Sequence, residues 1–190
     1  MILRLHFPLS VLSVGHGHTV NYLVREKVSK YIALEPNTLM HPEIRKLAGS
    51  KGFTEADGTL LILSCGAEDV SSILAALDEP NSVDTLISIL VLCSIPAPEQ
   101  VLGALVRDVL KSDGSLLFYE HVLSPREDVA WWQRFWTPVW KLAFDGCRLD
   151  RPTHLWVERM GVWSAGDIWN KPGEDEESLF THRIGKFVKT

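Results

Sequence analysis

Residues 11–37 read VLSVGHGHTVNYLVREKVSKYIALEPN, and this stretch decides the fold. Its apolar start over residues 11–14 predicts a buried strand, which the glycine loop GHGHT of residues 15–19 follows. We expect a short helix over residues 20–27 and a second strand over residues 31–34 that ends at an acid. Such a unit of strand, glycine loop, helix, strand and acid typically holds the ribose and charged tail of an adenosine-containing ligand.

Gly15, Gly17 and Glu35 carry the ligand-binding chemistry of this unit. Glycine lets the backbone approach a ligand where a Cβ would collide, and the N–H groups at the start of a helix favour negative charge. Glu35 follows Gly15 by twenty positions and can accept hydrogen bonds from two ribose hydroxyls. The third glycine of a dinucleotide fingerprint is replaced by Val20, which favours S-adenosylmethionine over a nicotinamide cofactor. Alternatively, the two glycines only make a tight turn between strand and helix.

Composition restricts the class of protein. The chain has 190 residues, 46% of them hydrophobic and 23% charged, which suits one soluble domain with a full core. A net charge of −5 argues against a broad nucleic-acid-binding face, so we expect no nucleic-acid partner. Cys65, Cys93 and Cys147 are sparse and widely spaced, which suggests reduced thiols and a cytoplasmic location.

No segment of the sequence is typical of a membrane span. The longest apolar run, Leu86 to Ile95, is too short to cross a bilayer. Residues 1–15 resemble a weak signal peptide, but their end is needed as the first strand, so we interpret them as structural. We therefore expect a single domain over residues 1–190 with no integral membrane segment.

The rest of the chain alternates between strand and helix patterns. Further strands are expected over residues 59–63, 83–88, 115–122, 162–169 and 181–188. Helices are expected over residues 41–50, 71–77, 99–110, 126–136 and 154–160, with Pro138 breaking the fourth of these. The alternation predicts an α/β fold with a parallel sheet covered by helices on both faces. Because a hairpin-like loop joins the last two strands, one of them should run antiparallel at the edge.

These segments together resemble the class I S-adenosylmethionine-dependent methyltransferases. The order of the glycine loop, the acid Glu35, the loop Gly66-Ala67-Glu68 and a terminal hairpin is that of this family. Four segments are similar to the small membrane-associated thiol methyltransferase subgroup: YIALEPN at 31–37, LVLCS at 90–94, YEH at 119–121 and FDGC at 144–147. The resemblance implies a Rossmann-like fold with a seven-stranded, mostly parallel sheet and an antiparallel C-terminal edge hairpin.

The resemblance also implies a site for S-adenosylmethionine. Its residues would be Gly15 and Gly17 beside the amino acid part, Glu35 at the ribose with Asn37 nearby, Ala67 and Glu68 at the adenine, and Ile89 and Leu90 near the methionine portion. Two residues depart from the family pattern, because Ser13 is normally acidic and Thr19 is normally glycine. The resemblance also implies helices before the first strand, and we expect this chain to lack them.

Methyl transfer requires a nucleophile aligned behind the sulfonium-bound methyl group and, for a hydroxyl acceptor, a base. His121 follows the fifth strand at the correct end of the sheet for a base, and Asp145 could orient a base or the acceptor. The alternatives are a loop histidine bonded to the backbone and a plain Asp-Gly turn. Cys93 and Cys147 are expected to be small buried apolar residues.

Two further patterns have open interpretations. His16 and His18 form a His-x-His pair, but spacing supplies no third ligand, so we expect no metal. A group of tryptophans would either wall an apolar acceptor pocket, belong to the core or form a surface in peripheral contact with a membrane: Trp131, Trp132, Trp136 and Trp140.

The function expected from the sequence is S-adenosylmethionine-dependent methyl transfer to a thiol or hydroxyl of a small apolar molecule. The departures at Ser13 and Thr19 keep a second hypothesis open, a non-catalytic methyltransferase-like binding protein. A methyltransferase fold with a non-methylating reaction is a third hypothesis, and a nicotinamide-dependent reductase is disfavoured by Val20. A homo-oligomer is compatible with every one of these hypotheses.

Overall fold

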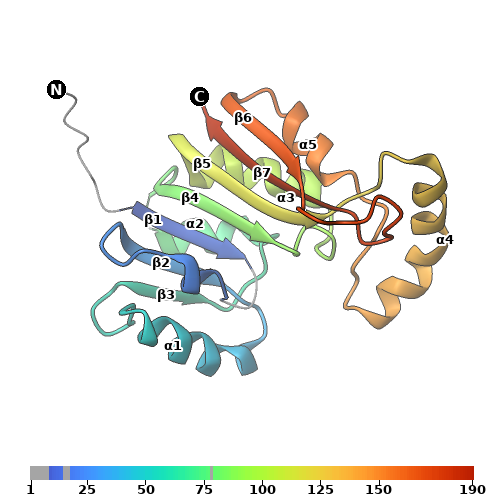
Figure 1. Ribbon diagram of the computed structural model, residues 1–190. Helices are drawn as coiled ribbons and strands as arrows, with labels where there is room; N and C mark the ends of the chain where they lie inside the picture. The colour runs from blue at the N-terminus through green and yellow to red at the C-terminus, as the bar shows by residue number, and fades with distance from the viewer. Residues whose placement is uncertain (1–8, 15–17, 78) are drawn as a thin grey trace.

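The computed structural model describes residues 9–14, 18–77 and 79–190 and contains a seven-stranded sheet (Figure 1). The spatial order of the strands is β3-β2-β1-β4-β5-β7-β6. Their bounds are β1 Leu9–Val14, β2 Val28–Leu34, β3 Leu60–Leu63, β4 Val83–Ile89, β5 Leu110–His121, β6 Trp163–Asn170 and β7 His182–Lys189. The first five strands are parallel, so their carboxyl ends share one edge of the sheet.

The C-terminal strands confirm the predicted antiparallel hairpin and refine its placement. β7 pairs antiparallel with β5 on one side and with β6 on the other. The edge strand is therefore β6, and β7 lies one position inside the sheet. The α/β fold with a mostly parallel seven-stranded sheet is confirmed.

Helices cover both faces of the sheet, as the alternation predicted. Their bounds are α1 His41–Ser50, α2 Val70–Leu77, α3 Pro98–Ala104 with a π-helical turn η3 Leu105–Val109, α4 Glu127–Ala143 and α5 Thr153–Arg159. Neighbouring residues of a strand point to opposite faces. Val11 thus packs in the core beneath α1, and Leu12 packs in the core beneath α2, α3 and α5. Helix α4 lies beyond the carboxyl ends of β4 and β5 (Figure 1).

The helix predicted over residues 20–27 is wrong. The segment forms only a 3₁₀ helix, η1 His18–Tyr22, followed by a turn, because β2 begins already at Val28. Arg25 stabilises the turn. Its Nε donates to the carbonyl of Gly52 at 2.8 Å and its Nη1 to the carbonyl of Val28 at 3.0 Å. The connection from β1 to β2 is therefore compact.

The predicted break at Pro138 is also wrong, because α4 continues through it. Proline removes one helical hydrogen bond, but side chains on the buried face of α4 anchor the helix elsewhere. The amide of Gln133 bonds the N–H of Ser124 at 2.8 Å and the carbonyls of Val122 and Leu179 at 3.1 and 2.9 Å. These bonds fix the first half of α4 to the end of β5 and to the hairpin loop.

Helix α5 contains a histidine that should make stability depend on pH. The Nδ1 atom of His154 is buried without a hydrogen-bond partner among the described residues, and burial and the charge of Arg183 lower its pKa from 6.5 to about 4. Because the folded pKa lies below the unfolded one, stability is lost as the pH falls from about 6.5 toward about 4. After allowance for solvent screening, the loss from this group between about pH 7 and about pH 5 should be roughly 1 kcal/mol.

Urea unfolding at those two pH values measures this contribution. The variant His154→Leu should show a smaller drop in stability than the native chain, because it has no proton to gain on unfolding. An identical pH dependence of the two proteins would contradict this role for His154.

Candidate functional site

A cavity of about 350 Å³ opens at the carboxyl ends of β2, β3 and β4. This is the edge where open α/β sheets bind their ligands. Its wall is formed by residues from four separate loops: Leu34, Glu35, Pro36, Gly66, Ala67, Glu68, Leu90, Val91, Ser94, Ile95, Pro96 and Asp145. The wall is apolar on the side of the β4 loop and carries acidic groups on the other sides.

Glu35 is the buried acid of this cavity, with 4% of its surface exposed. It follows the last residue of β2, so the direction of the strand aims it at the opening. Its Oε1 accepts the N–H of Asn37 at 2.9 Å, and its backbone carbonyl accepts from Nε2 of His41 at 2.8 Å. The carboxylate is therefore held in place and can accept further hydrogen bonds from a ligand.

The loops after β3 and β4 form the facing walls. Ala67 is buried, and a Cβ at Gly66 would run into the carboxylate of Glu68, so glycine lets this acid fold back over its own loop. Leu90 has a left-handed backbone with φ 54°, which is costly for a leucine. Its N–H donates to the carbonyl of Tyr119 at 2.9 Å, which fixes this turn against β5.

Five of the residues predicted from the sequence line this cavity: Glu35, Ala67, Glu68, Leu90 and Asp145. Asn37 does not line it, because its side chain accepts the N–H of Leu39 and caps η2 Thr38–Met40. Ile89 ends β4 outside the wall. Gly15 and Gly17 lie outside the described residues, as does His16, and the side chain of His18 is likewise not described.

The two departures from the family pattern bond each other. The hydroxyls of Ser13 and Thr19 lie 2.8 Å apart, and both residues are buried. Ser13 belongs to β1 and Thr19 to η1, so this hydrogen bond joins the two ends of the glycine loop. At the two positions where the family resemblance implies an acid and a glycine, this chain therefore has a neutral hydrogen-bonded pair.

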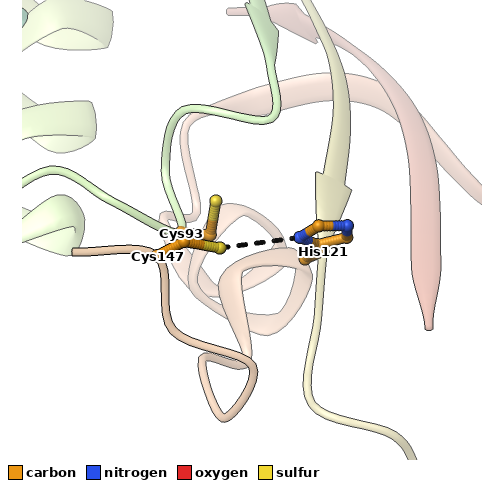
Figure 2. Close-up of side chains that lie close together, drawn as sticks. All are labelled: Cys93, His121 and Cys147. Atoms are coloured by element: carbon orange, nitrogen blue, oxygen red, sulfur yellow. Dashed lines mark hydrogen bonds between the residues drawn. The ribbon is translucent and has the colours of Figure 1, made fainter. Parts of the chain in front are cut away.

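His121 lies away from the cavity wall, in a cluster with Cys93 and Cys147 (Figure 2). The two sulfurs and one imidazole nitrogen lie within 4.8 Å of one another, and Sγ of Cys147 is 3.8 Å from Nδ1 of His121. Cys93 comes from the loop after β4, His121 ends β5, and Cys147 comes from the loop after α4. Both cysteines are buried, as predicted, but their sulfurs also lie close to each other and to the imidazole of His121.

The two thiols of the cluster have opposite acidities. A hydrogen bond with Cys93 lowers the pKa of the Cys147 thiol, burial opposes that shift, and His121 adds to it. The bond with Cys147 and burial raise the pKa of the Cys93 thiol. Proton release from the pair therefore leaves the first negative charge on Cys147, beside the imidazole.

The sequence alone did not reveal this cluster, because its three residues are far apart in the chain and no short ligand motif joins them. One signal was present. Cys93 lies in the loop after β4, and His121 is the last residue of β5. These two strands are neighbours in the sheet, so their carboxyl ends meet. Only the position of Cys147 depended on the path of the chain after α4.

A second cavity of about 350 Å³ lies beside the cluster and is almost wholly apolar. Its wall consists of Trp136, Val139, Trp140, Ala143, Phe144, Leu149, Leu179 and Phe180. Trp136 and Trp140 thus wall a pocket, as one interpretation of the tryptophans expected, whereas Trp131 and Trp132 are 56% and 46% exposed on the outer face of α4. In the part of the chain described here, no helix is both long and apolar enough to cross a bilayer.

Comparison with known proteins agrees with this architecture. The family model described as "Methyltransferase domain" matches residues 11–118. The thiol S-methyltransferase TMT1B of Rattus norvegicus is 38% identical over 182 residues, which cover 95% of this chain and 71% of the relative. The human TMT1B is 45% identical over 146 residues, which cover 76% of this chain and 56% of the relative. The matched regions thus range from just over half to about seven tenths of these relatives.

Solved structures show the same fold at low sequence identity. YcgJ from Bacillus subtilis superposes with a TM-score of 0.64 at 16% identity, over 96% of this chain and 92% of the other. A geranyl diphosphate methyltransferase in complex with SAM gives a TM-score of 0.68 at 10% identity, over 96% and 79% of the two chains. The family model covers more than half of the chain and the rat relative matches most of it, so the chain belongs to the S-adenosylmethionine-dependent methyltransferase family and is similar within it to the thiol S-methyltransferases.

Proposed function

We propose that the chain binds S-adenosylmethionine in the cavity at the ends of β2, β3 and β4 and transfers its methyl group to the thiol of a small apolar molecule. The observation that supports this most is Glu35, a buried carboxylate fixed at the end of β2 and facing the cavity wall formed by Ala67 and Glu68. An acid at this position accepts hydrogen bonds from vicinal hydroxyls.

The residues of the cavity fit this cofactor. Its volume of about 350 Å³ is within the range of small-molecule sites. Glu35 would hold the ribose, Ala67 and Glu68 would meet the adenine, and Leu90 would pack near the methionine portion. Gly15 and Gly17 remain the residues predicted to pass beside its amino acid part. The cofactor supplies a methyl group on a positively charged sulfur, and the chain binds it and orients the acceptor.

A thiol is the acceptor that this site favours. The relatives that match most of the chain are named thiol S-methyltransferases. A thiol with a pKa near 8.5 is already partly ionised at neutral pH, whereas a hydroxyl needs a base. The sequence predicted His121 as that base, but His121 is not part of the cofactor cavity wall. Its position therefore supports a thiol acceptor, which needs a base less than a hydroxyl does. Asp145, in the wall, would help to position the acceptor.

The reaction can be tested directly. The chain is incubated with S-adenosylmethionine and a series of short alkyl thiols, and mass spectrometry measures the methyl thioether and S-adenosylhomocysteine in equal amounts. The matched alkyl alcohols should give far less product. Binding of S-adenosylhomocysteine without thioether from any thiol would instead support the non-catalytic binding protein.

The apolar cavity next to Phe144 is the proposed site for the body of the acceptor. Val139 lines it and is 58% exposed, so Val139→Asp should fold normally but place a charge in an apolar wall. We expect the KM for an apolar thiol to rise about tenfold with little change in cofactor affinity. Leu142→Asp is the matched control, because Leu142 is 84% exposed on the same helix and outside the wall. An equal rise in KM for both variants would contradict this assignment.

Two features bear on the location and the partners of the chain: its unpaired cysteines and the exposed face of α4. The three cysteines are unpaired, which supports a reducing compartment such as the cytoplasm. The exposed aromatic face of α4, with Trp131 and Trp132, supports peripheral contact with a membrane or with a second copy of the chain. Flotation with lipid vesicles and light scattering would test these two contacts.

A further inference from the structure

The cluster of Cys93, His121 and Cys147 lies between the proposed cofactor cavity and the apolar cavity. One loop connects them, since Asp145 lines the cofactor cavity while Phe144 and Leu149 line the apolar cavity. Cys147 belongs to this same loop and is 7% exposed. A group bound at the cluster would therefore lie where an acceptor in one cavity approaches a methyl group in the other.

The spacing of the three side chains suits a thiophilic metal ion. Zinc binds sulfur at about 2.3 Å and imidazole nitrogen at about 2.0–2.1 Å, so tetrahedral geometry separates these two ligands by about 3.6 Å. Sγ of Cys147 and Nδ1 of His121 are 3.8 Å apart. All three ligand atoms lie within 4.8 Å of one another, so closing them around an ion needs shifts of about 1 Å or less.

The backbone around the two cysteines is already held in place. The N–H of Arg148 donates to the carbonyl of Cys93 at 2.9 Å and joins the two ligand-bearing loops. Nη1 of Arg151 donates to the carbonyls of Leu92 and Ile95 at 2.6 and 2.8 Å, on either side of Cys93. Such outer contacts orient metal ligands before the ion arrives.

The imidazole of His121 is also oriented by its surroundings. Its ring packs against Phe180 at 5.8 Å and against His182 at 4.5 Å between ring centres. Nδ1 of His182 bonds the carboxylate of Glu174 at 2.5 Å, so this second ring is fixed in turn. The packing leaves Nδ1 of His121 facing the sulfur of Cys147 (Figure 2).

Charge favours a divalent ion over two free thiolates. Two buried negative sulfurs would repel each other, whereas two thiolates, one neutral imidazole and one dication form a neutral group that can be buried. Three protein ligands also leave one position of a tetrahedral ion open. In zinc proteins this arrangement is typical of catalytic sites, and structural sites use four protein ligands.

We propose that Cys93, His121 and Cys147 bind a zinc ion whose open position takes the sulfur of the acceptor. This role rests on the proposed thiol methylation. The acceptor thiol releases its proton to solvent when it binds the ion. Its sulfur then forms a bond to the methyl carbon while the bond from that carbon to the cofactor sulfur breaks, and the electron pair stays on that sulfur. The products are a methyl thioether and S-adenosylhomocysteine, and His121 acts as a ligand instead of a base.

Cobalt(II) is the probe for the metal site, because thiolate-bound cobalt has intense charge-transfer absorption and tetrahedral cobalt has strong visible bands. The metal-free 190-residue chain titrated with cobalt should show both, with a one-to-one endpoint, and zinc should displace the cobalt. Cys93→Ser and Cys147→Ser should each weaken binding roughly 100-fold or more. Cys65→Ser should not change it, because Cys65 is outside the cluster.

A second measurement shows which cluster variants are folded. S-adenosylhomocysteine binding by each variant, within about twofold of native, shows that the fold is intact, because its cavity does not include the cluster side chains. Absence of the thiolate-to-cobalt band in the native chain would overturn the metal site. An unchanged band in Cys147→Ser would overturn it as well.

A second experiment separates the metal from the reaction. Removal of zinc should lower turnover of an alkyl thiol at least about tenfold, and added zinc should restore it, with cofactor affinity unchanged. Turnover without bound zinc would overturn the metal proposal and leave thiol methylation standing. A chain that binds zinc and S-adenosylhomocysteine but methylates no thiol would leave the metal site standing and overturn the proposed function.

Discussion

Replacing Glu35 by alanine should lower the affinity for S-adenosylhomocysteine by at least about 100-fold. Glu35 is 4% exposed, so hydrogen bonds from a ribose to its carboxylate would form away from water. A hydrogen bond to a charged group contributes about 1.5–3 kcal/mol, and two of them account for a loss of this size. Calorimetric titration of the purified variant measures it.

Two further variants make the Glu35 result specific. Glu35→Gln keeps the shape and one acceptor oxygen, so it should bind with intermediate affinity. Glu43→Ala removes an acid from the surface of α1 and should bind like the native chain. Binding by Glu35→Ala within about fivefold of native would mean that the cofactor does not use this carboxylate, and the proposed site would have to be abandoned.

Replacing Gly185 by valine should destabilise the protein by about 3 kcal/mol, the upper end of the usual cost of overpacking. Gly185 lies in β7 opposite Phe118 of β5, and a Cβ at this position would run into the Phe118 ring. That ring is buried and stacks on Phe187 with ring centres 6.3 Å apart, so it has little room to move. The Phe118 ring occupies the space that a side chain at position 185 would need.

Gly49→Ala is the opposite case and the control. Gly49 lies in α1, and a Cβ there would meet no atom within 4 Å. Alanine should therefore raise stability by about 0.5–1 kcal/mol through its better helix propensity. Urea unfolding at equilibrium measures both variants. A stability of Gly185→Val equal to the native value would show that the strands move apart at little cost.

The parts of the fold that local patterns determine were predictable. Apolar runs identified all seven strands, and the bounds of α1 were predicted to the residue. The prediction of a helix over residues 20–27 was wrong because Arg25 binds the backbone of Gly52 in a distant loop, a tertiary contact that no local pattern contains. Pro138 failed to end α4 for a similar reason, since the bonds of Gln133 hold the helix from outside it.

In the candidate site, too, local patterns predict some residues and tertiary contacts decide the others. The position of Glu35, Ala67 and Glu68 in the cavity wall could be predicted, because each follows a parallel strand and the carboxyl ends of such strands meet. Asn37 stays a predicted cofactor residue, but it does not line the cavity, because its side chain accepts the N–H of Leu39 in the next turn. The grouping of His121 with two cysteines depended on the path of the loop after α4, which sequence patterns do not reveal.

The position of β7 between β5 and β6 imposes an order on folding. β6 is synthesised first, yet its pairing partner in the described sheet is β7, which is made after it. Until residues 182–189 have emerged, β6 has nothing to join, and β5 keeps a free side whose unpaired backbone groups could pair with another chain. Newly made chains should therefore be most prone to aggregation just before β7 inserts, and conditions that speed this one pairing should raise the yield of folded protein.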